Sequence, residues 1–142
     1  MKKIKAYLAG KLWEESERER LRKIDSLCKS LKIITYLPYR DGGFARKIKD
    51  VKRIFKADIT DSLPYCDIII ADLDGLHVGA GTAFELGYAY ARRIKMIGIK
   101  TDEPAEKALD YLSPMILGSM KIVPNLKELE KELKKFVKKS LL

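Results

Sequence analysis

The chain has 142 residues, 46% of them hydrophobic, which suits a single domain with one core over residues 1–142. Its formal net charge is +9, but the basic residues alternate with glutamates on amphipathic stretches and accompany no aromatic platform or recognition motif, so we expect no nucleic-acid partner. The apolar run after the basic stretch Lys2 to Lys5 is too short for a signal peptide or a membrane span, so we expect a cytoplasmic protein without a membrane partner.

The first part of the chain predicts two strands and two helical stretches. Residues 4–8 form a short strand, and apolar residues then recur at helical spacing between charged ones. Residues 33–37 form a second strand that Pro38 stops. A polar loop is expected at residues 39–43, followed by a basic helical stretch from residue 44 to about residue 57.

The central strand is predicted at residues 67–73, because the unbroken apolar run Ile68 to Ala71 is typical of a strand buried on both faces of a parallel sheet. A glycine-rich turn then leads into a helix from Thr82 to Arg93. The remaining elements are a strand at 96–99, a helical segment at 104–111, a strand at 121–123 and a final helix capped by Asn125. On that helix the pairs Glu130 with Lys134 and Glu128 with Lys131 have the spacing of surface ion pairs.

Strands that alternate with helices imply an α/β domain with a five-stranded, doubly wound parallel sheet, helices on both faces and right-handed crossovers. Ligands of such sheets bind beyond the carboxyl ends of the strands, near the point where the strand order reverses. We therefore expect the site in residues 9–13, 38–43, 72–85 and 101–103.

The cysteines and the histidine indicate neither a metal nor another cofactor. Cys28 and Cys66 fit no metal spacing, and His77 is the only histidine. We interpret both cysteines as reduced core residues.

The segment from Asp72 to Ala89 carries the chemistry. It places Glu85 in the first turn of a helix directly beyond a buried strand, where a carboxylate can form an ester with an anomeric carbon. The alternative is that Thr82-Ala83-Phe84-Glu85 is a capping box, in which Glu85 only satisfies a backbone donor. The glycines around it favour close approach of a ligand to the backbone, although their spacing is not that of a P-loop or a dinucleotide fingerprint.

Three motifs together resemble the nucleoside 2-deoxyribosyltransferase family. They are Tyr7-Leu8-Ala9-Gly10, Ala71-Asp72-Leu73-Asp74-Gly75 and Gly81-Thr82-Ala83-Phe84-Glu85-Leu86-Gly87-Tyr88-Ala89. The resemblance spans nearly the whole chain and implies a flavodoxin-like fold that acts on a deoxynucleoside or deoxynucleotide and a nucleobase. It also implies a homo-oligomer, a dimer or larger, in which a neighbouring subunit completes the site.

The resemblance also implies roles for individual residues. Glu85 would attack C1' of the deoxyribose, and a second base or water would resolve the covalent deoxyribosyl-enzyme. Tyr7 would orient Glu85, while the loop of Ala9 and Gly10 and the backbone at Gly81 would line the substrate pocket.

The departing base needs a proton, and Asp58 is the family's best positional match for the acid that supplies it. The spacing from Asp58 to Asp67 is one residue longer than the family pattern, so Asp61 is a second candidate. Either aspartate would otherwise cap the short helix before the central strand.

The chain departs from the family at two positions. Gly79 stands where an aspartate usually holds the sugar hydroxyls, a contact that Asp72 or Asp74 would have to replace, and Lys11 stands where proline is usual. The loss of an acid and the gain of a lysine both favour binding of a 5'-phosphate. In this respect the chain resembles a related branch of the family, the deoxynucleoside 5'-monophosphate N-hydrolases. Ser113 resembles the serine that those enzymes supply from a neighbouring subunit, or it is a turn or helix-capping residue before Pro114. A third alternative is a nucleotide-binding module without turnover.

Overall fold

The apolar run at residues 68–71 forms the middle of β3 (Ile68–Asp72), the central strand in the computed structural model, which describes residues 2–142. All five residues of β3 are buried, as expected for a strand with helices on both sides. The sheet is parallel throughout, in the order β2-β1-β3-β4-β5, which confirms the flavodoxin-like doubly wound prediction. The other strands are β1 (Lys5–Ala9), β2 (Ile34–Tyr36), β4 (Lys95–Ile99) and β5 (Lys121–Val123).

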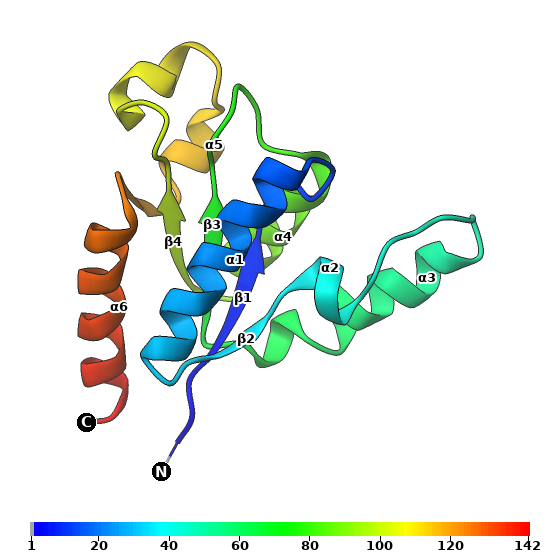
Figure 1. The fold of residues 1–142 in the computed structure, drawn as a ribbon, viewed down its shortest axis with the longest axis horizontal. Coiled ribbons are helices and arrows are strands. Elements are labelled where there is room, and N and C mark those ends of the chain that lie inside the picture. The colour runs from blue at the N-terminus through cyan, green and yellow to red at the C-terminus, as the bar shows by residue number, and fades with distance from the viewer. Residues whose placement is uncertain (1) are drawn as a thin grey trace.

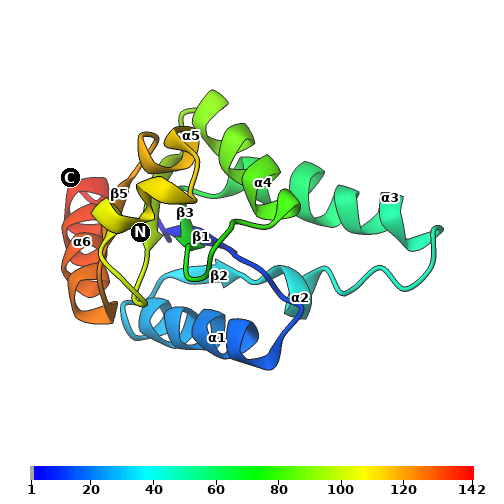
Figure 2. The ribbon, with the colours of Figure 1, turned by 90° about the horizontal axis from the view of Figure 1, so that it is seen from above.

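Helices cover both faces of this sheet, as Figures 1 and 2 show. α1 (Glu15–Ser30) and α6 (Leu126–Ser140) pack on one face, where Leu21 of α1 belongs to one hydrophobic cluster. α4 (Ala80–Ala91) lies on the opposite face, where Leu86 belongs to a second cluster. Because successive strand residues point to opposite faces, β1, β3, β4 and β5 each contribute to both clusters.

The prediction of a loop at residues 39–43 is wrong, because a short helix, α2 (Pro38–Asp41), occupies most of this segment. Pro38 takes the first helical position, where its fixed φ angle suits a helix and its missing N–H costs nothing. A carboxylate oxygen of Asp41 accepts the amide of Leu37 at 2.9 Å and closes the turn.

The helical stretch predicted from residue 44 begins later, at α3 (Asp50–Phe55). The Asp50 carboxylate accepts the backbone amides of Arg46 and Lys47 at 3.1 and 3.2 Å, so the chain ahead of the helix is held by a side chain instead of by helical bonds. α3 runs directly into a π-helical turn at Lys56–Thr60, and it projects away from the sheet in Figures 1 and 2.

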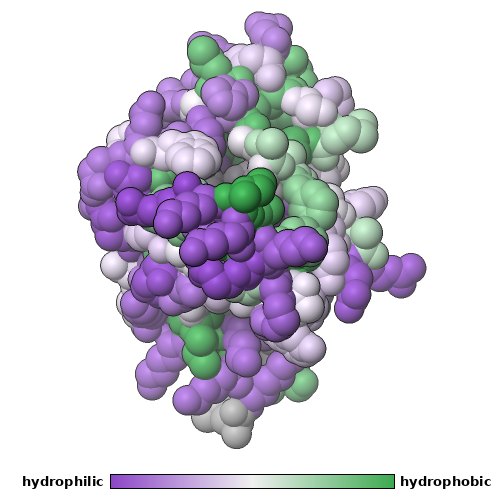
Figure 3. All heavy atoms as spheres, turned by 90° about the vertical axis from the view of Figure 1, so that its right-hand side faces the viewer, coloured by the Kyte–Doolittle hydropathy of each residue, from purple (hydrophilic) through white to green (hydrophobic). Residues whose placement is uncertain are grey.

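The side from which α3 projects carries exposed apolar residues among charged ones (Figure 3). Val51 and Phe55 of α3 are about half exposed, and Phe84 of α4 is 55% exposed. The rings of Phe55 and Phe84 meet edge to face with their centroids 5.9 Å apart. This contact ties α3 to α4.

The end of the chain follows the prediction closely. Asn125 caps α6 and accepts the amide of Glu128 at 2.9 Å, and the ion pairs Glu130 with Lys134 and Glu128 with Lys131 measure 3.2 and 3.3 Å. The segment predicted as helical at 104–111 is a 3-10 helix. The remaining short elements are a 3-10 turn at Leu63–Tyr65, the 3-10 helix at Ala105–Asp110 and α5 (Pro114–Leu117).

Both cysteines are free, with Cys28 buried in the first cluster and Cys66 packed against the second. Within residues 2–142, none of the helices combines the length and apolar character that crossing a membrane requires.

Candidate active site

Glu85 lies in the second turn of α4, because the helix begins at Ala80 with Gly79 as its N-cap. The helix therefore begins two residues before the predicted start at about Thr82. A residue in the second turn does not reach the free amides at the helix start, so the capping-box interpretation of Glu85 is wrong. The side chain is instead bound by Tyr7 from β1.

Tyr7 is fully buried, and its hydroxyl donates a hydrogen bond to Oε2 of Glu85. Burial raises the pKa of Glu85 to about 8, the hydrogen bond from Tyr7 works against this rise, and the negative charge of Asp58 adds to it. Burial and the neighbouring Glu85 charge also raise the pKa of Tyr7, so the phenol stays protonated and remains a donor. Glu85 therefore keeps its proton to a higher pH than an exposed glutamate does.

Asp58 faces the same cluster from the π-helical turn after α3. Its Oδ1 accepts the hydroxyl of Tyr36 at 2.7 Å, and the Tyr36 ring stacks on Tyr7 with centroids 5.4 Å apart. Burial raises the pKa of Asp58, while the bond from Tyr36 lowers it. Asp61 lies apart in an exposed ion pair with Lys56 at 2.8 Å, so the structure brings Asp58 and not Asp61 to Glu85.

The predictions had missed Tyr36. Tyr36 is the last residue of β2 and pairs in register with Tyr7 on the adjacent strand β1. Neighbouring residues of parallel strands point to the same face. Sequence alone does not supply the strand order or register, so this pairing could not be read before the fold was known.

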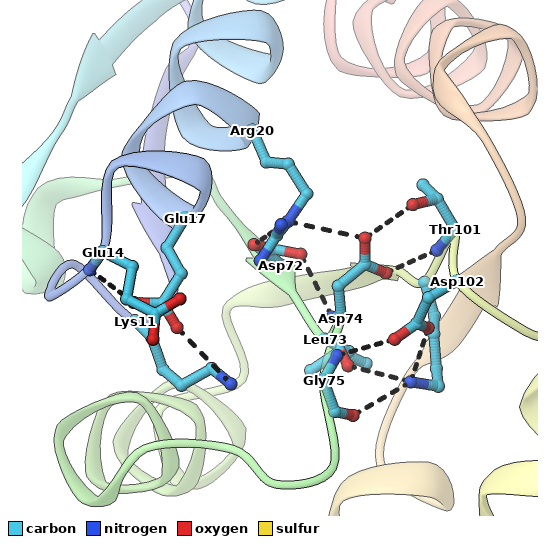
Figure 4. A network of polar contacts seen from close by, with 11 residues as sticks. Lys11, Glu14, Glu17, Arg20, Asp72, Leu73, Asp74, Gly75, Thr101 and Asp102 are labelled. Atoms are coloured by element: carbon cyan, nitrogen blue, oxygen red, sulfur yellow. Dashed lines mark hydrogen bonds and ion pairs between the residues drawn. The ribbon is translucent and has the colours of Figure 1, made fainter.

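Lys11 explains why residue 79 is a glycine. Its largely buried side chain crosses the glycine-rich turn, and a Cβ on Gly79 would lie 3.2 Å from Lys11 Cγ. Nζ of Lys11 lies beside Gly75 and 3.5 Å from Oε2 of Glu17 (Figure 4). The two residues that depart from the expected pattern are therefore in contact, and a side chain at position 79 would require Lys11 to shift slightly.

Asp72 and Asp74 belong to a buried polar network at the carboxyl edge of the sheet (Figure 4). Arg20 from α1 bonds Asp72 at 3.0 Å and pairs with Asp74 at 3.4 Å. Thr101 donates both its amide and its hydroxyl to Asp74 at 2.5 Å. Burial raises the pKa of Asp72 and Arg20 opposes this. These contacts favour a structural role, and the sugar contact expected of either aspartate remains a prediction.

The same network fastens the loop that leads to α4. The ammonium of Lys100 is buried, donates to the carbonyls of Leu73 and Gly75 at 3.3 and 3.2 Å, and pairs with Asp102 at 2.8 Å. Asp102 also accepts the amide of Gly75 at 2.8 Å. The approach to α4 and Glu85 is therefore held by side chains from the end of β4.

The small residues of the predicted pocket differ in their surroundings. Ala9 is fully buried, and a Cβ on Gly10 would lie 3.2 Å from side-chain atoms of Asp72 and Leu21, so Gly10 permits close packing of the β1 end. Gly81 is exposed in the first turn of α4, with open space where a Cβ would be. Of these three residues, Gly81 is the one free to meet a ligand.

Ser113 caps α5 and accepts the amide of Met115 at 3.1 Å, as the helix-capping alternative expected. It also lines an apolar groove of about 610 Å³ between α4 and α5. The groove meets α4 at Ala83, Leu86, Gly87 and Tyr90. At 100° per residue, this face points away from Glu85, so Ser113 does not belong to the Glu85 cluster of its own subunit.

The sequence model described as nucleoside 2-deoxyribosyltransferase matches residues 6–129. No curated protein matches the chain in sequence.

Solved structures share the fold at low sequence identity. A conserved protein from Enterococcus faecalis is 24% identical with a TM-score of 0.73, over 94% of this chain and 99% of its own. The 2-deoxyribosyltransferase of Bacillus psychrosaccharolyticus is 19% identical with a TM-score of 0.73, over 89% and 90%. A CMP N-glycosidase of Clostridium botulinum is 18% identical with a TM-score of 0.57, over 92% and 98%.

Proposed function

This chain belongs to the nucleoside 2-deoxyribosyltransferase family, and on that premise we propose that it cleaves the N-glycosidic bond of 2'-deoxynucleosides and transfers the deoxyribosyl group to another nucleobase. The family supports a glycosyl-transferring or N-glycoside-cleaving enzyme. The observation that carries the proposal is the cluster of two carboxylates, Glu85 and Asp58, each bound by a tyrosine hydroxyl, that of the buried Tyr7 and that of the half-buried Tyr36.

In the first step, an Oε atom of the ionised Glu85 carboxylate forms a bond to C1' while the bond from C1' to the base nitrogen breaks. The electron pair of the broken bond stays on the base, and the carboxyl proton of Asp58 moves to it. The base leaves neutral, and the sugar remains as an ester on Glu85. Tyr7 keeps its hydrogen bond to Glu85 and aims the carboxylate at the sugar carbon.

In the second step, a nitrogen of the incoming base attacks C1' and its proton passes to the Asp58 carboxylate. The ester bond breaks, and Glu85 returns to its starting state. Water in place of the base would give free deoxyribose and the same proton transfer. Both carboxyls thus change charge in each half-reaction, which fits two groups whose pKa values burial raises.

The test is to incubate the protein with one deoxynucleoside and a different free base, then to separate the products by chromatography. We expect the exchanged nucleoside, and we expect the Glu85→Ala variant to form none. If neither exchange nor base release occurs across a broad panel of nucleosides and monophosphates, the enzymatic proposal is wrong. Binding of a nucleotide in calorimetry without any turnover would then favour the non-catalytic module.

One observation favours a second candidate, hydrolysis of 2'-deoxynucleoside 5'-monophosphates. The ammonium of Lys11 lies beside the glycine-rich turn, close to the start of α4, whose N-cap Gly79 brings no side-chain cap. A positive charge next to a helix N-terminus attracts a phosphate. Free base released from the monophosphate but not from the nucleoside would select this candidate, and Lys11→Ala should then raise KM for the monophosphate alone.

We also propose that a second copy of the chain binds at the apolar groove between α4 and α5. Met115 and Tyr90 expose 76% and 66% of their surface there and line the groove together with apolar residues of α4 and α5. A continuous apolar surface of this kind marks protein interfaces. Ser113 on this groove would then face the neighbouring subunit. Sedimentation velocity should show an oligomer that Met115→Glu dissociates, and a monomeric wild type would contradict the proposal.

A further inference from the structure

Gly42 has no side chain for a steric reason. Its φ and ψ angles are −100° and −23°, which any residue can adopt, so backbone conformation does not require glycine. A Cβ at this position would lie 2.8 Å from the hydroxyl of Tyr36 and closer still to Oδ1 of Asp58. It would also lie 3.1 Å from the carbonyl of Pro38. A side chain at position 42 would therefore have to displace the Asp58 carboxylate and the Tyr36 hydroxyl from their present positions.

Asp58 reaches this place by an irregular backbone. The π-helical turn Lys56–Thr60 follows α3 without a break, and no side chain caps it. Such turns widen a helix locally and are frequent at functional sites. The carboxylate thus comes to a position over Gly42, opposite the hydroxyl of Tyr36.

Tyr36 links Asp58 to the other half of the cluster. Its hydroxyl donates to Asp58 at 2.7 Å, and its ring stacks on Tyr7, whose hydroxyl donates to Glu85. Each carboxylate is therefore held by one tyrosine, and the two tyrosines pack against each other on adjacent strands. A rigid pair of this kind keeps the relative position of the two carboxylates constant.

We propose that Tyr36 and Gly42 are positioning residues, which hold the carboxyl of Asp58 where it protonates the leaving base. The inference rests on the proposed function and extends it to two residues that touch Asp58 and not the sugar carbon. Tyr36 bonds one carboxyl oxygen, Oδ1, and this leaves Oδ2 to carry the proton toward the base. Gly42 supplies the space in which that orientation is reached.

The proposal makes a prediction about the leaving group. A base that departs easily as an anion needs little protonation, whereas an ordinary base needs the acid. We expect Tyr36→Phe to lower kcat/KM for thymidine about 10-fold and Gly42→Ala about 100-fold, since a misplacement of about 1 Å costs roughly that much. With 5-trifluoromethyl-2'-deoxyuridine, whose base is a better leaving group, both losses should shrink to a few-fold.

Two controls separate positioning from general damage. Tyr65 follows Asp58 in the sequence, and its side chain is 70% exposed. Tyr65→Phe removes its hydroxyl and should leave kcat/KM for both substrates unchanged. In an Asp58→Asn background, adding Gly42→Ala or Tyr36→Phe should cost no further activity, because their effect passes through Asp58. Circular dichroism identifies the variants that fold, and Tyr36→Phe carries the test if Gly42→Ala does not.

The outcomes are distinct. Equal losses on both substrates, or no loss, in variants of an active wild type would overturn the roles of Tyr36 and Gly42 and leave the proposed function standing. A further loss on top of Asp58→Asn would overturn them as well. If wild-type protein releases base from neither substrate nor from their 5'-monophosphates, the proposed function and this inference fall together.

Discussion

Replacing Glu85 by glutamine removes one titratable carboxyl group while it keeps the size of the side chain. The pKa of Glu85 is raised from its ordinary value of 4.5 to about 8, chiefly by burial. The folded protein therefore binds this proton more tightly than the unfolded chain, and the free energy of unfolding falls as pH rises from about 4.5 to about 8. Glu85→Gln has no such proton, so its stability relative to wild type should increase over that range.

The size of this change in stability follows from the rise in the pKa of Glu85. At about 1.4 kcal/mol per pH unit, the whole interval corresponds to at most about 5 kcal/mol. Glu85 is partly exposed, so water stabilises some of its charge, and we expect a relative gain of about 1–3 kcal/mol between pH 5 and pH 8. The same variant should lose base release by at least about 1,000-fold, because the nucleophile is gone.

The assay is urea unfolding of both proteins at pH 5, 6, 7 and 8, followed by circular dichroism, with base release measured on the same samples. A difference in the free energy of unfolding that is the same at every pH is not informative, because the glutamine amide makes hydrogen bonds of its own. The informative quantity is how this difference changes with pH. A difference that stays flat across this range would show that Glu85 is ionised at little cost in the folded protein. The argument for a buried nucleophile would then be refuted.

Three other predictions concern single side chains. Tyr7→Phe removes the hydrogen-bond donor that lowers the pKa of Glu85. In wild type, kcat/KM should rise with pH as Glu85 ionises near pH 8, and in the variant this rise should move to higher pH. An unchanged pH profile would contradict the role of Tyr7. Gly79→Asp requires only a small shift of Lys11 but puts a negative charge near its ammonium, so kcat/KM for a deoxynucleoside 5'-monophosphate should fall about 10-fold more than that for the nucleoside. Equal losses would argue against a phosphate there. Asn125→Ala removes the cap of α6 and should cost about 1 kcal/mol in urea unfolding with no change in kcat; a change in kcat would mean that α6 contributes to the site.

The local pattern of residues was sufficient to predict the order of the strands and helices along the chain. The run from Ile68 to Ala71 is apolar at every position and became a strand buried on both faces. Asn125 precedes an amphipathic stretch and became its cap. These features depend on residues a few positions apart, which interact through the local backbone, so they can be read without knowing the fold.

The boundaries of helices were harder to predict where side chains that are distant in the sequence determine them. The helix of Glu85 starts at Ala80 instead of Thr82, at the end of a loop whose Gly75 is bound by Lys100 and Asp102 from beyond β4. α3 starts at Asp50 because that carboxylate takes up two amides ahead of it. Local propensity does not encode such contacts.

Sequence alone determined the fold class, the family resemblance and Glu85 as the candidate nucleophile. Only the tertiary structure decided that Asp58 and not Asp61 lies with Glu85, that Tyr36 binds it, and that Gly42 leaves room for the pair. The physical reason is that these contacts join β1, β2, α4 and a π-helical turn, and their geometry follows from the strand order and register of the sheet. Those in turn depend on packing of the whole core, which no short stretch of residues specifies.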